Sequence, residues 1–190
     1  MNLANTITLS RMAMIPCFVL AVLYYAKGVA IGAPQEWQRW LAMTFFALAT
    51  LSDGVDGYIA RHLNEKTRLG SILDPIADKA LLLTSLFLLS WNHGRAFDQI
   101  PLWFPVIVIS RDIVVVLGVA LIFMMGRGFD VQPSWTGKIA TALQMITLGI
   151  VLLKLPGLYW EIPLWAAAVC TVVSGAAYVV HGMRKLTVNP

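Results

Sequence analysis

The stretches SDGVDGYIAR (residues 52–61) and LGSILDPIADK (residues 69–79) place four aspartates inside an otherwise apolar chain. An ionised carboxylate near hydrocarbon is costly unless a cation or hydrogen bonds compensate it. A chain that keeps four carboxylates close together is therefore expected to hold a cation there. The same two stretches decide the fold, because one closes a long apolar run and the other opens the next.

The composition around these stretches is that of an integral membrane protein. Of the 190 residues, 58% are hydrophobic and only 13% are charged, and the mean hydropathy is +0.74. A soluble domain usually carries about twice that share of charge. The length suits one domain, residues 1–190, with six transmembrane helices of about 20 residues each. The apolar runs are continuous rather than alternating, which argues against a β-barrel.

Polar separators containing Gly, Pro and charged residues divide the chain into six predicted spans. We expect an all-α fold with spans at residues 6–27, 38–61, 71–91, 102–125, 138–155 and 161–183.

The distribution of Lys and Arg predicts the orientation, since basic residues favour the cytoplasmic side. One side would hold Arg11, Arg61, Lys66, Arg68, Arg127, Lys138, Arg184 and Lys185, and the other Lys27, Arg39, Arg95 and Lys154. This bias places both termini and the aspartate-rich loop in the cytoplasm, in a multi-pass protein of the cell inner or plasma membrane. Trp37, Trp40, Trp91, Trp103 and Trp160 would form an interfacial belt at the opposite ends.

The net charge of +4 fits basic loops in contact with anionic lipid headgroups. No soluble basic segment is present that could bind nucleic acid. Cys17 and Cys170 lie in apolar runs and are expected to be reduced packing residues. A cleaved signal peptide within residues 1–27 is disfavoured, because the charged start is thin and no small-residue cleavage site follows.

Helical spacing arranges the four aspartates as two pairs. Asp53 and Asp56 are three residues apart at the end of the second predicted span, and Asp74 and Asp78 are four apart at the start of the third. Residues at these spacings share a helix face. A short loop makes the two helices antiparallel neighbours, so their cytoplasmic ends bring the four carboxylates together.

All-oxygen ligation of this kind suits Mg²⁺ or Mn²⁺ rather than zinc. Paired hard cations recur in phosphoryl chemistry, the neighbouring glycines leave room for a phosphate ligand, and Arg61 supplies a fixed cation for phosphate oxygens. The alternative is structural: Asp53 could cap a helix and Asp78 could pair with Lys79. That alternative explains one or two aspartates, not four at helical spacing.

The pattern Asp-x₂-Asp-Gly-x₂-Ala-Arg-x₈-Gly-x₃-Asp-x₃-Asp resembles the signature of the CDP-alcohol phosphatidyltransferases. It is met by Asp53, Asp56, Gly57, Ala60, Arg61, Gly70, Asp74 and Asp78. Residues 2–11 resemble the N-terminal amphipathic segment of that family. Pro75 and Lys79 resemble the branch that contains phosphatidylglycerophosphate synthases and eukaryotic-type cardiolipin synthases.

The resemblance implies that the four aspartates hold two divalent cations against the diphosphate of CDP-diacylglycerol. It implies that Asp78 is also the general base that deprotonates the acceptor hydroxyl. Contacts to the CDP-linked lipid are implied for Asn5, Thr8, Gly57, Arg61 and Thr67. It further implies a homodimer.

The acceptor is expected to be glycerol 3-phosphate, with phosphatidylglycerol, the acceptor of a cardiolipin synthase, as the alternative. Arg111 stands inside the fourth span, where an arginine is either functional or part of an internal pair with Asp112. Lys138 and Thr141 could meet an acceptor phosphate, although Lys138 could also be a snorkelling interfacial lysine. A phosphate monoester needs more positive charge than a phosphodiester, and Arg111 with Lys138 could supply it. Gln144 on the same face could simply bond between helices.

Two further hypotheses come from other functional classes. A cation transporter would distribute acidic residues along the membrane depth, whereas here all four aspartates cluster at one end. A structural membrane protein without chemistry at this cluster would tolerate Asp78→Asn silently. The sequence therefore favours a membrane-embedded, metal-dependent transferase of phospholipid biosynthesis.

Overall fold

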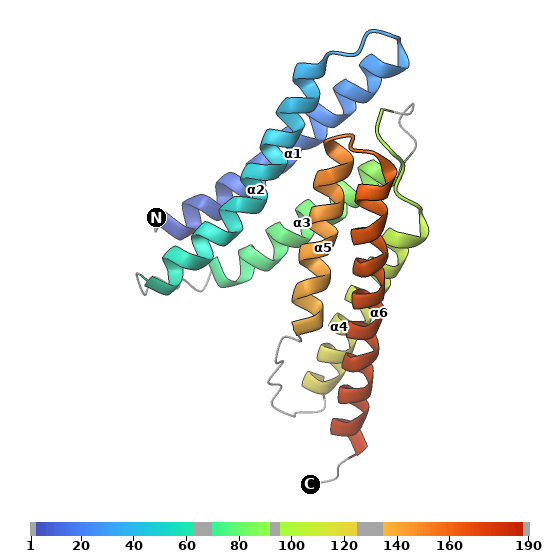
Figure 1. The fold of residues 1–190 in the computed structure, drawn as a ribbon. Coiled ribbons are helices and arrows are strands. Elements are labelled where there is room, and N and C mark those ends of the chain that lie inside the picture. The colour runs from blue at the N-terminus through green and yellow to red at the C-terminus, as the bar shows by residue number, and fades with distance from the viewer. Residues whose placement is uncertain (1–2, 63–69, 92–95, 125–134, 188–190) are drawn as a thin grey trace. The chain divides into compact units, whose positions relative to one another are not determined.

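The computed structural model describes residues 3–62, 70–91, 96–124 and 135–187. Over these residues the chain forms six helices (Figure 1): α1 (Leu3–Ala30), α2 (Glu36–His62), α3 (Gly70–Ser90), α4 (Trp103–Met124), α5 (Trp135–Leu152) and α6 (Gly157–Thr187). The predicted all-α class is confirmed for this part of the chain. Each helix overlaps one predicted span, with ends that differ by only a few residues.

Local chain chemistry explains where α1 ends. The amide of Ala33 donates to the carbonyl of Gly28 at 2.9 Å, and Gly32 takes a φ of +74°. A residue in this left-handed conformation commonly closes a helix, and glycine adopts it without steric cost. At the other end, the predicted amphipathic segment and the first span form one continuous helix, so this segment is not a separate element.

Within the described residues, three helices contain a stretch long and apolar enough to cross a membrane, at Thr8–Ala30, Trp135–Leu152 and Gly157–Val180. Large apolar side chains are also exposed on several helices, among them Leu20, Phe87, Val116 and Trp165. Exposed apolar surface on this scale is typical of a protein that faces lipid. These observations support the predicted membrane protein, and the prediction that all six helices span the bilayer stays a prediction.

The chain divides into two compact units, and the prediction of one domain over residues 1–190 stays a prediction. The first unit comprises residues 1–100 and 148–157. In it α1 packs against α2 and α3, and α2 also contacts α3. The rings of Phe18 on α1 and Phe46 on α2 lie 5.9 Å apart in the core of this unit. The start of α1, the end of α2 and the start of α3 lie at one end of the unit (Figure 1).

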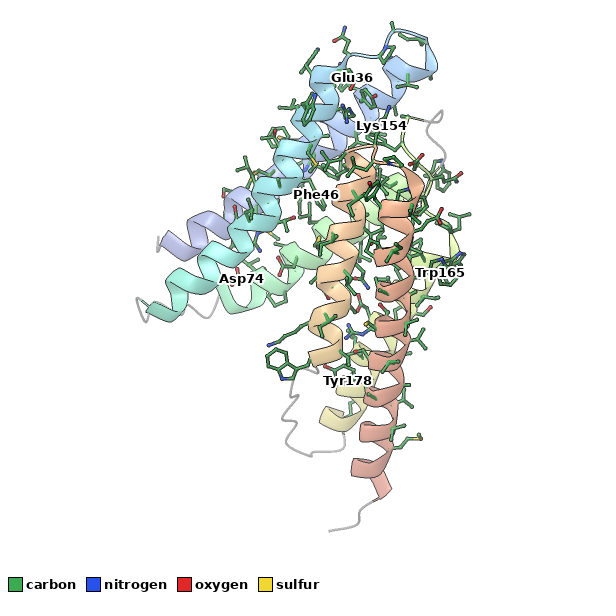
Figure 2. The ribbon with its side chains drawn as sticks, in the orientation of Figure 1. Glu36, Phe46, Asp74, Lys154, Trp165 and Tyr178 are labelled. Carbon is green, nitrogen blue, oxygen red and sulfur yellow. The ribbon has the colours of Figure 1, made fainter. Side chains whose placement is uncertain are left out.

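A polar cluster holds the other end of this unit together. The Lys154 ammonium donates to the Tyr25 hydroxyl at 2.6 Å, which in turn donates to Glu36 at 3.0 Å. Arg39 donates to Glu36 at 2.6 Å and to the carbonyl of Leu153 at 3.2 Å. These contacts join the α5–α6 turn to the α1–α2 hairpin, and Figure 2 shows Glu36 and Lys154 close together.

This polar cluster confirms that Arg39 and Lys154 lie at the same end of the helices, as their grouping in the sequence predicted. The Arg39 guanidinium, followed by the Tyr25 hydroxyl, holds the pKa of the Glu36 carboxyl below its usual range. The carboxyl is therefore ionised over a wider pH interval when the chain is folded.

The second unit comprises residues 101–147 and 158–190. The rings of Trp103 on α4 and Trp165 on α6 lie 4.9 Å apart. Eight residues further along α4, Arg111 contacts Ser174 on α6, so α4 and α6 run in parallel. Gln144 on α5 contacts Thr171 on α6. The second unit is thus held by aromatic contacts near the start of α4 and by polar contacts further along.

The burial of two residues adds to what the sequence predicted. Cys17 and Cys170 are both free, as expected, but Cys17 is exposed rather than packed. Trp160, predicted to belong to the interfacial belt, does lie near the start of α6, but its side chain is buried. In both cases a local apolar run predicts the helix but not which of its faces meets a neighbour.

Candidate functional site

Asp74 and Asp78 stand one turn apart on α3, and both side chains contact α1. The Thr8 hydroxyl donates to Asp74 Oδ1 at 2.6 Å. The Arg11 guanidinium donates through Nη1 to Asp78 Oδ1 at 2.7 Å. Figure 2 shows Asp74 on α3 in the first unit. The predicted sharing of one helix face by the two aspartates is confirmed, because Thr8 and Arg11 are themselves one turn apart.

The other two aspartates lie on α2, where Asp53 and Asp56 keep the predicted helical spacing. Their side chains lie outside the described part of the structure. The same holds for three predicted lipid-contact residues on helices, Asn5, Gly57 and Arg61. Thr67 lies wholly outside the described residues. The structure thus brings the two helices of the motif into contact, and the convergence of all four carboxylates stays a prediction.

The contacts of α1 give the site a strongly asymmetric environment. The Arg11 side chain is fully buried, with 0% exposure, whereas Asp78 remains 36% exposed. A charge-assisted hydrogen bond of this length is among the stronger polar contacts in proteins. One oxygen of Asp78 is therefore held by a buried cation, while the carboxylate as a whole stays reachable from outside.

Among the side chains that the structure describes, Arg11 is a site residue that the sequence reasoning missed. The sequence places it in the cytoplasmic set of basic residues and in the N-terminal segment of residues 2–11, without a role in the site. A signal was present, because Thr8 and Arg11 are three residues apart and helix geometry places them on one face. Thr8 had been implied as a nucleotide contact; in the structure its hydroxyl contacts Asp74, and a nucleotide contact stays a prediction.

The residues present fit a hard divalent cation. Carboxylate oxygens are the ligands that Mg²⁺ and Mn²⁺ prefer, and Asp78 already accommodates a positive group at Oδ1. Among the side chains that the structure describes, no group of three or more potential ligands gathers. Only Asp74 and Asp78 of the four predicted ligands belong to that part.

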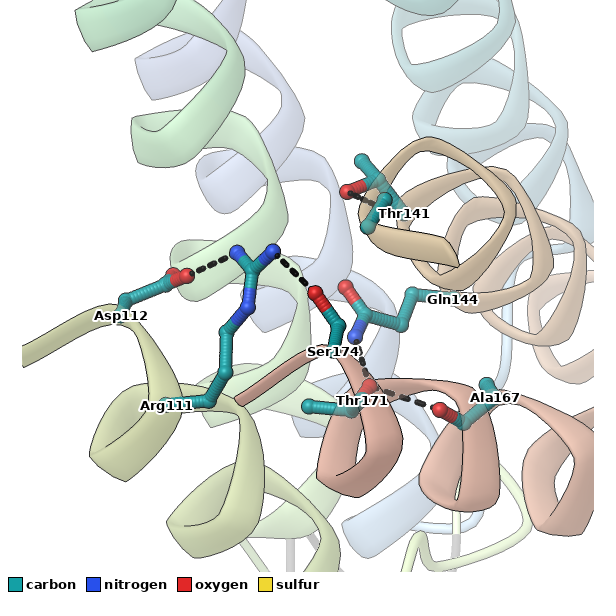
Figure 3. A network of polar contacts seen from close by, with 8 residues as sticks. Arg111, Asp112, Thr141, Gln144, Ala167, Thr171 and Ser174 are labelled. Carbon is teal, nitrogen blue, oxygen red and sulfur yellow. Dashed lines mark hydrogen bonds and ion pairs between the residues drawn. The ribbon is translucent and has the colours of Figure 1, made fainter. Parts of the chain in front are cut away.

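Arg111, a predicted acceptor contact, is engaged within its own unit (Figure 3). Its guanidinium donates to Asp112 at 2.9 Å and to the Ser174 hydroxyl at 2.9 Å. It also lies 5.6 Å from the centre of the Tyr178 ring. These contacts favour the interpretation of an internal lock between α4 and α6, one of the two weighed from the sequence. Contact with an acceptor stays a prediction.

The remaining acceptor candidates lie on α5. Lys138 is exposed, and its ammonium lies 5.4 Å from the centre of the Trp135 ring. The Thr141 hydroxyl donates to the carbonyl of Gly137 on its own helix at 3.1 Å. Gln144 donates to Thr171 on α6 at 2.9 Å, which confirms its predicted bond between helices. Of the three, only Lys138 presents an exposed charged group to a ligand.

Comparison with known proteins agrees with the motif. A family model described as CDP-alcohol phosphatidyltransferase matches residues 1–173. A probable phosphatidylglycerophosphate synthase of Mycobacterium tuberculosis (strain H37Rv) is 34% identical over 189 residues, covering 97% of this chain and 83% of the relative.

Two further relatives are named CDP-diacylglycerol--glycerol-3-phosphate 3-phosphatidyltransferase. The Bacillus subtilis (strain 168) protein is 36% identical over 195 residues, which covers 93% of each chain. The Escherichia coli (strain K12) protein is 30% identical over 181 residues, covering 93% of this chain and 92% of the relative. The family model matches most of this chain, and the relatives are similar to it over nearly its whole length. This chain therefore belongs to the CDP-alcohol phosphatidyltransferase family.

Proposed function

We propose that this protein transfers the phosphatidyl group of CDP-diacylglycerol to glycerol 3-phosphate and releases CMP, a step of phospholipid biosynthesis. The observation that carries the proposal is the end-to-end similarity to relatives named for this transfer or for its product. Those names favour glycerol 3-phosphate over phosphatidylglycerol as the acceptor. The contacts of Asp74 and Asp78 supply the site at which the transfer would occur.

Four aspartates, Asp53, Asp56, Asp74 and Asp78, would hold two Mg²⁺ or Mn²⁺ ions. When bound, such ions neutralise the diphosphate and make cytidine monophosphate a better leaving group. The remaining roles belong to the chain itself. Arg61 and Gly57 would contact the CDP part of the donor, with Asn5, Thr8 and Thr67 near the nucleotide and diphosphate.

Asp78 would take the proton from the acceptor hydroxyl. Its partial exposure leaves room for a hydroxyl to come within hydrogen-bond reach, which a general base requires. The acceptor oxygen then forms a bond to the phosphorus of the phosphatidyl group as the bond to the CMP oxygen breaks. This direct displacement predicts no CMP exchange into CDP-diacylglycerol when the acceptor is absent.

For the acceptor phosphate, Lys138 is an exposed cation at the start of α5, and Thr141 stands one turn further on. Arg111 would support this region by fixing α4 against α6 rather than by contacting the ligand. In the membrane, all six helices would span the bilayer, with both termini and the aspartates in the cytoplasm. A homodimer is part of the same proposal.

The test is an assay of purified, full-length protein with labelled CDP-diacylglycerol. Glycerol 3-phosphate or phosphatidylglycerol is supplied, each with Mg²⁺ or with EDTA. We expect product with glycerol 3-phosphate and Mg²⁺ only. Product with phosphatidylglycerol alone would contradict the proposed acceptor, and CMP release that persists in EDTA would contradict the metal requirement.

The same assay tests the role of Asp78. Asp78→Asn should lower the rate by about 10²–10⁴-fold, the usual contribution of a general base. Asp98→Asn, at an exposed residue between α3 and α4, is the matched control and should keep the unsubstituted rate. Gel filtration and thermal unfolding check that both variants are folded. An active Asp78→Asn protein would remove Asp78 from the mechanism.

A further inference from the structure

The first helix gives each aspartate of α3 its own hydrogen-bond donor. Thr8 and Arg11 are both buried, and each reaches one carboxylate oxygen, at 2.6 Å on Asp74 and 2.7 Å on Asp78. The two contacts differ in kind, because Thr8 supplies a neutral hydroxyl and Arg11 a permanent charge. Because the candidate site would bind a cation, the charge of Arg11 affects cation binding directly, whereas the neutral hydroxyl of Thr8 does not.

A buried guanidinium has two opposing effects on a neighbouring metal ligand. It fixes the carboxylate in one orientation through a charge-assisted bond. It also repels a divalent cation and occupies Asp78 Oδ1, one of the oxygens that such a cation would use. Full burial of the Arg11 side chain makes both effects persistent, since a buried charge is screened much less than an exposed one.

We propose that Arg11 is a positioning residue that orients Asp78 and limits how tightly the site binds a divalent cation. The inference rests on the proposed metal site. In the metal-free chain Arg11 places a buried positive charge against Asp78. When a cation enters, the guanidinium shares Asp78 or yields its oxygen. The affinity of the site is therefore the outcome of a competition between a resident and an incoming cation.

Charge and hydrogen bonding are separated by two substitutions. Arg11→Gln keeps an N–H donor for Asp78 but removes the charge, whereas Arg11→Lys keeps the charge. The competition predicts that Arg11→Gln binds Mn²⁺ more tightly than the unsubstituted protein, by about tenfold. It predicts that Arg11→Lys stays close to the unsubstituted affinity. Both variants should have a lower kcat, because neither reproduces the orientation that the guanidinium gives Asp78.

A merely structural role for Arg11 predicts the opposite pattern for the metal. If the residue only packed α1 against α3, both substitutions would loosen the site, and Mn²⁺ binding would weaken together with activity. Thr8→Val is the matched comparison, because it removes the donor to Asp74 without changing charge. It should not raise Mn²⁺ affinity.

The experiment measures free Mn²⁺ by electron paramagnetic resonance, using full-length protein in detergent without lipid substrate. Thermal unfolding in EDTA establishes that each variant is folded. If Arg11→Gln does not fold, Arg11→Met, which keeps an apolar stem, serves as the second neutral variant. Tighter Mn²⁺ binding combined with a lower kcat supports the inference. Equal or weaker binding by the neutral variants overturns it.

The failure of the proposed metal site is distinguishable in the same measurements. Unsubstituted protein that binds no Mn²⁺ and is active in EDTA would overturn the metal site and the role of Arg11 together. Unsubstituted protein that binds Mn²⁺, with binding lost in Asp78→Asn, would uphold the site. In that case only the behaviour of the neutral Arg11 variants decides the present inference.

Discussion

Replacing Arg111 with Met tests whether this residue is a lock between helices or an acceptor contact. Met keeps an apolar stem of similar length and removes the hydrogen bonds of the guanidinium to Asp112 and Ser174. The Asp112 carboxylate, which is largely buried, would lose its ion pair with Arg111. The side chains of Arg111 and Asp112 are only 16% and 18% exposed.

Breaking a buried ion pair by removing one partner costs about 3–5 kcal/mol, because it leaves a buried charge uncompensated. Since each side chain is still partly exposed, we expect the lower end of that range, about 3 kcal/mol, for Arg111→Met. Removing both charges avoids leaving the Asp112 carboxylate without the Arg111 guanidinium. The double variant Arg111→Met/Asp112→Leu should therefore lie within roughly 1 kcal/mol of the unsubstituted protein.

Stability is measured by unfolding in mixed detergent micelles, and activity as kcat and KM for glycerol 3-phosphate. The lock predicts that the double variant recovers stability and, with it, most of the activity. A selective rise in KM for glycerol 3-phosphate in Arg111→Met, without loss of stability, would refute the lock. An acceptor contact would also leave the double variant inactive although stable.

Three further perturbations follow from contacts in the structure. Gln144→Leu should lower the free energy of unfolding by only about 0.6 kcal/mol, the average for a hydrogen bond between membrane helices. The loss is small because the Thr171 hydroxyl keeps its bond to the carbonyl of Ala167 on its own helix. Unfolding in detergent measures this loss, and a loss as large as that of a buried ion pair would contradict the prediction. Glu36→Gln should destabilise the protein at neutral pH, and the difference from the unsubstituted protein should vanish in acid. Folding lowers the pKa of Glu36. Its contribution to the free energy of unfolding is therefore present above the ordinary carboxyl range and disappears as pH falls through the lowered pKa. Thermal unfolding across pH checks this dependence, and a difference in stability that does not vary with pH would be inconsistent with it. Gly175→Val should destabilise the protein by about 1–3 kcal/mol through overpacking, because a Cβ added at Gly175 would lie 3.3 Å from Arg111 Cγ. Gly175→Ala is the milder control and should cost less. Valine and alanine variants of equal stability would argue against close packing at this position.

Local sequence was sufficient to predict the helices and the spacing of the motif. Apolar runs interrupted by polar separators predicted α1 to α6 to within a few residues, because hydrophobic length and turn chemistry act over short distances. The spacing of Asp74 and Asp78 predicted one shared face, and the structure confirms it. The distribution of Lys and Arg between the spans predicted that Arg39 and Lys154 lie at one end of the helices, and their contacts confirm it.

Contacts between distant segments were beyond local patterns. Thr8 and Asp74 are separated by 66 positions, and Arg11 and Asp78 by 67. A helical pattern states that two residues share a face but not which helix that face meets. Arg111 shows the same limit, because its partner Ser174 lies 63 positions away. The sequence left lock and ligand contact equally open there.

The sequence by itself determined an all-helical membrane protein and a motif that requires compensation of its carboxylates. The energetic cost of charge near hydrocarbon made that inference independent of the arrangement of the helices. Only the tertiary structure showed that the buried Arg11 guanidinium compensates part of the charge of these carboxylates. Burial of Arg11 against Asp78 depends on how α1 packs on α3, and packing is a property of the folded chain rather than of any one segment.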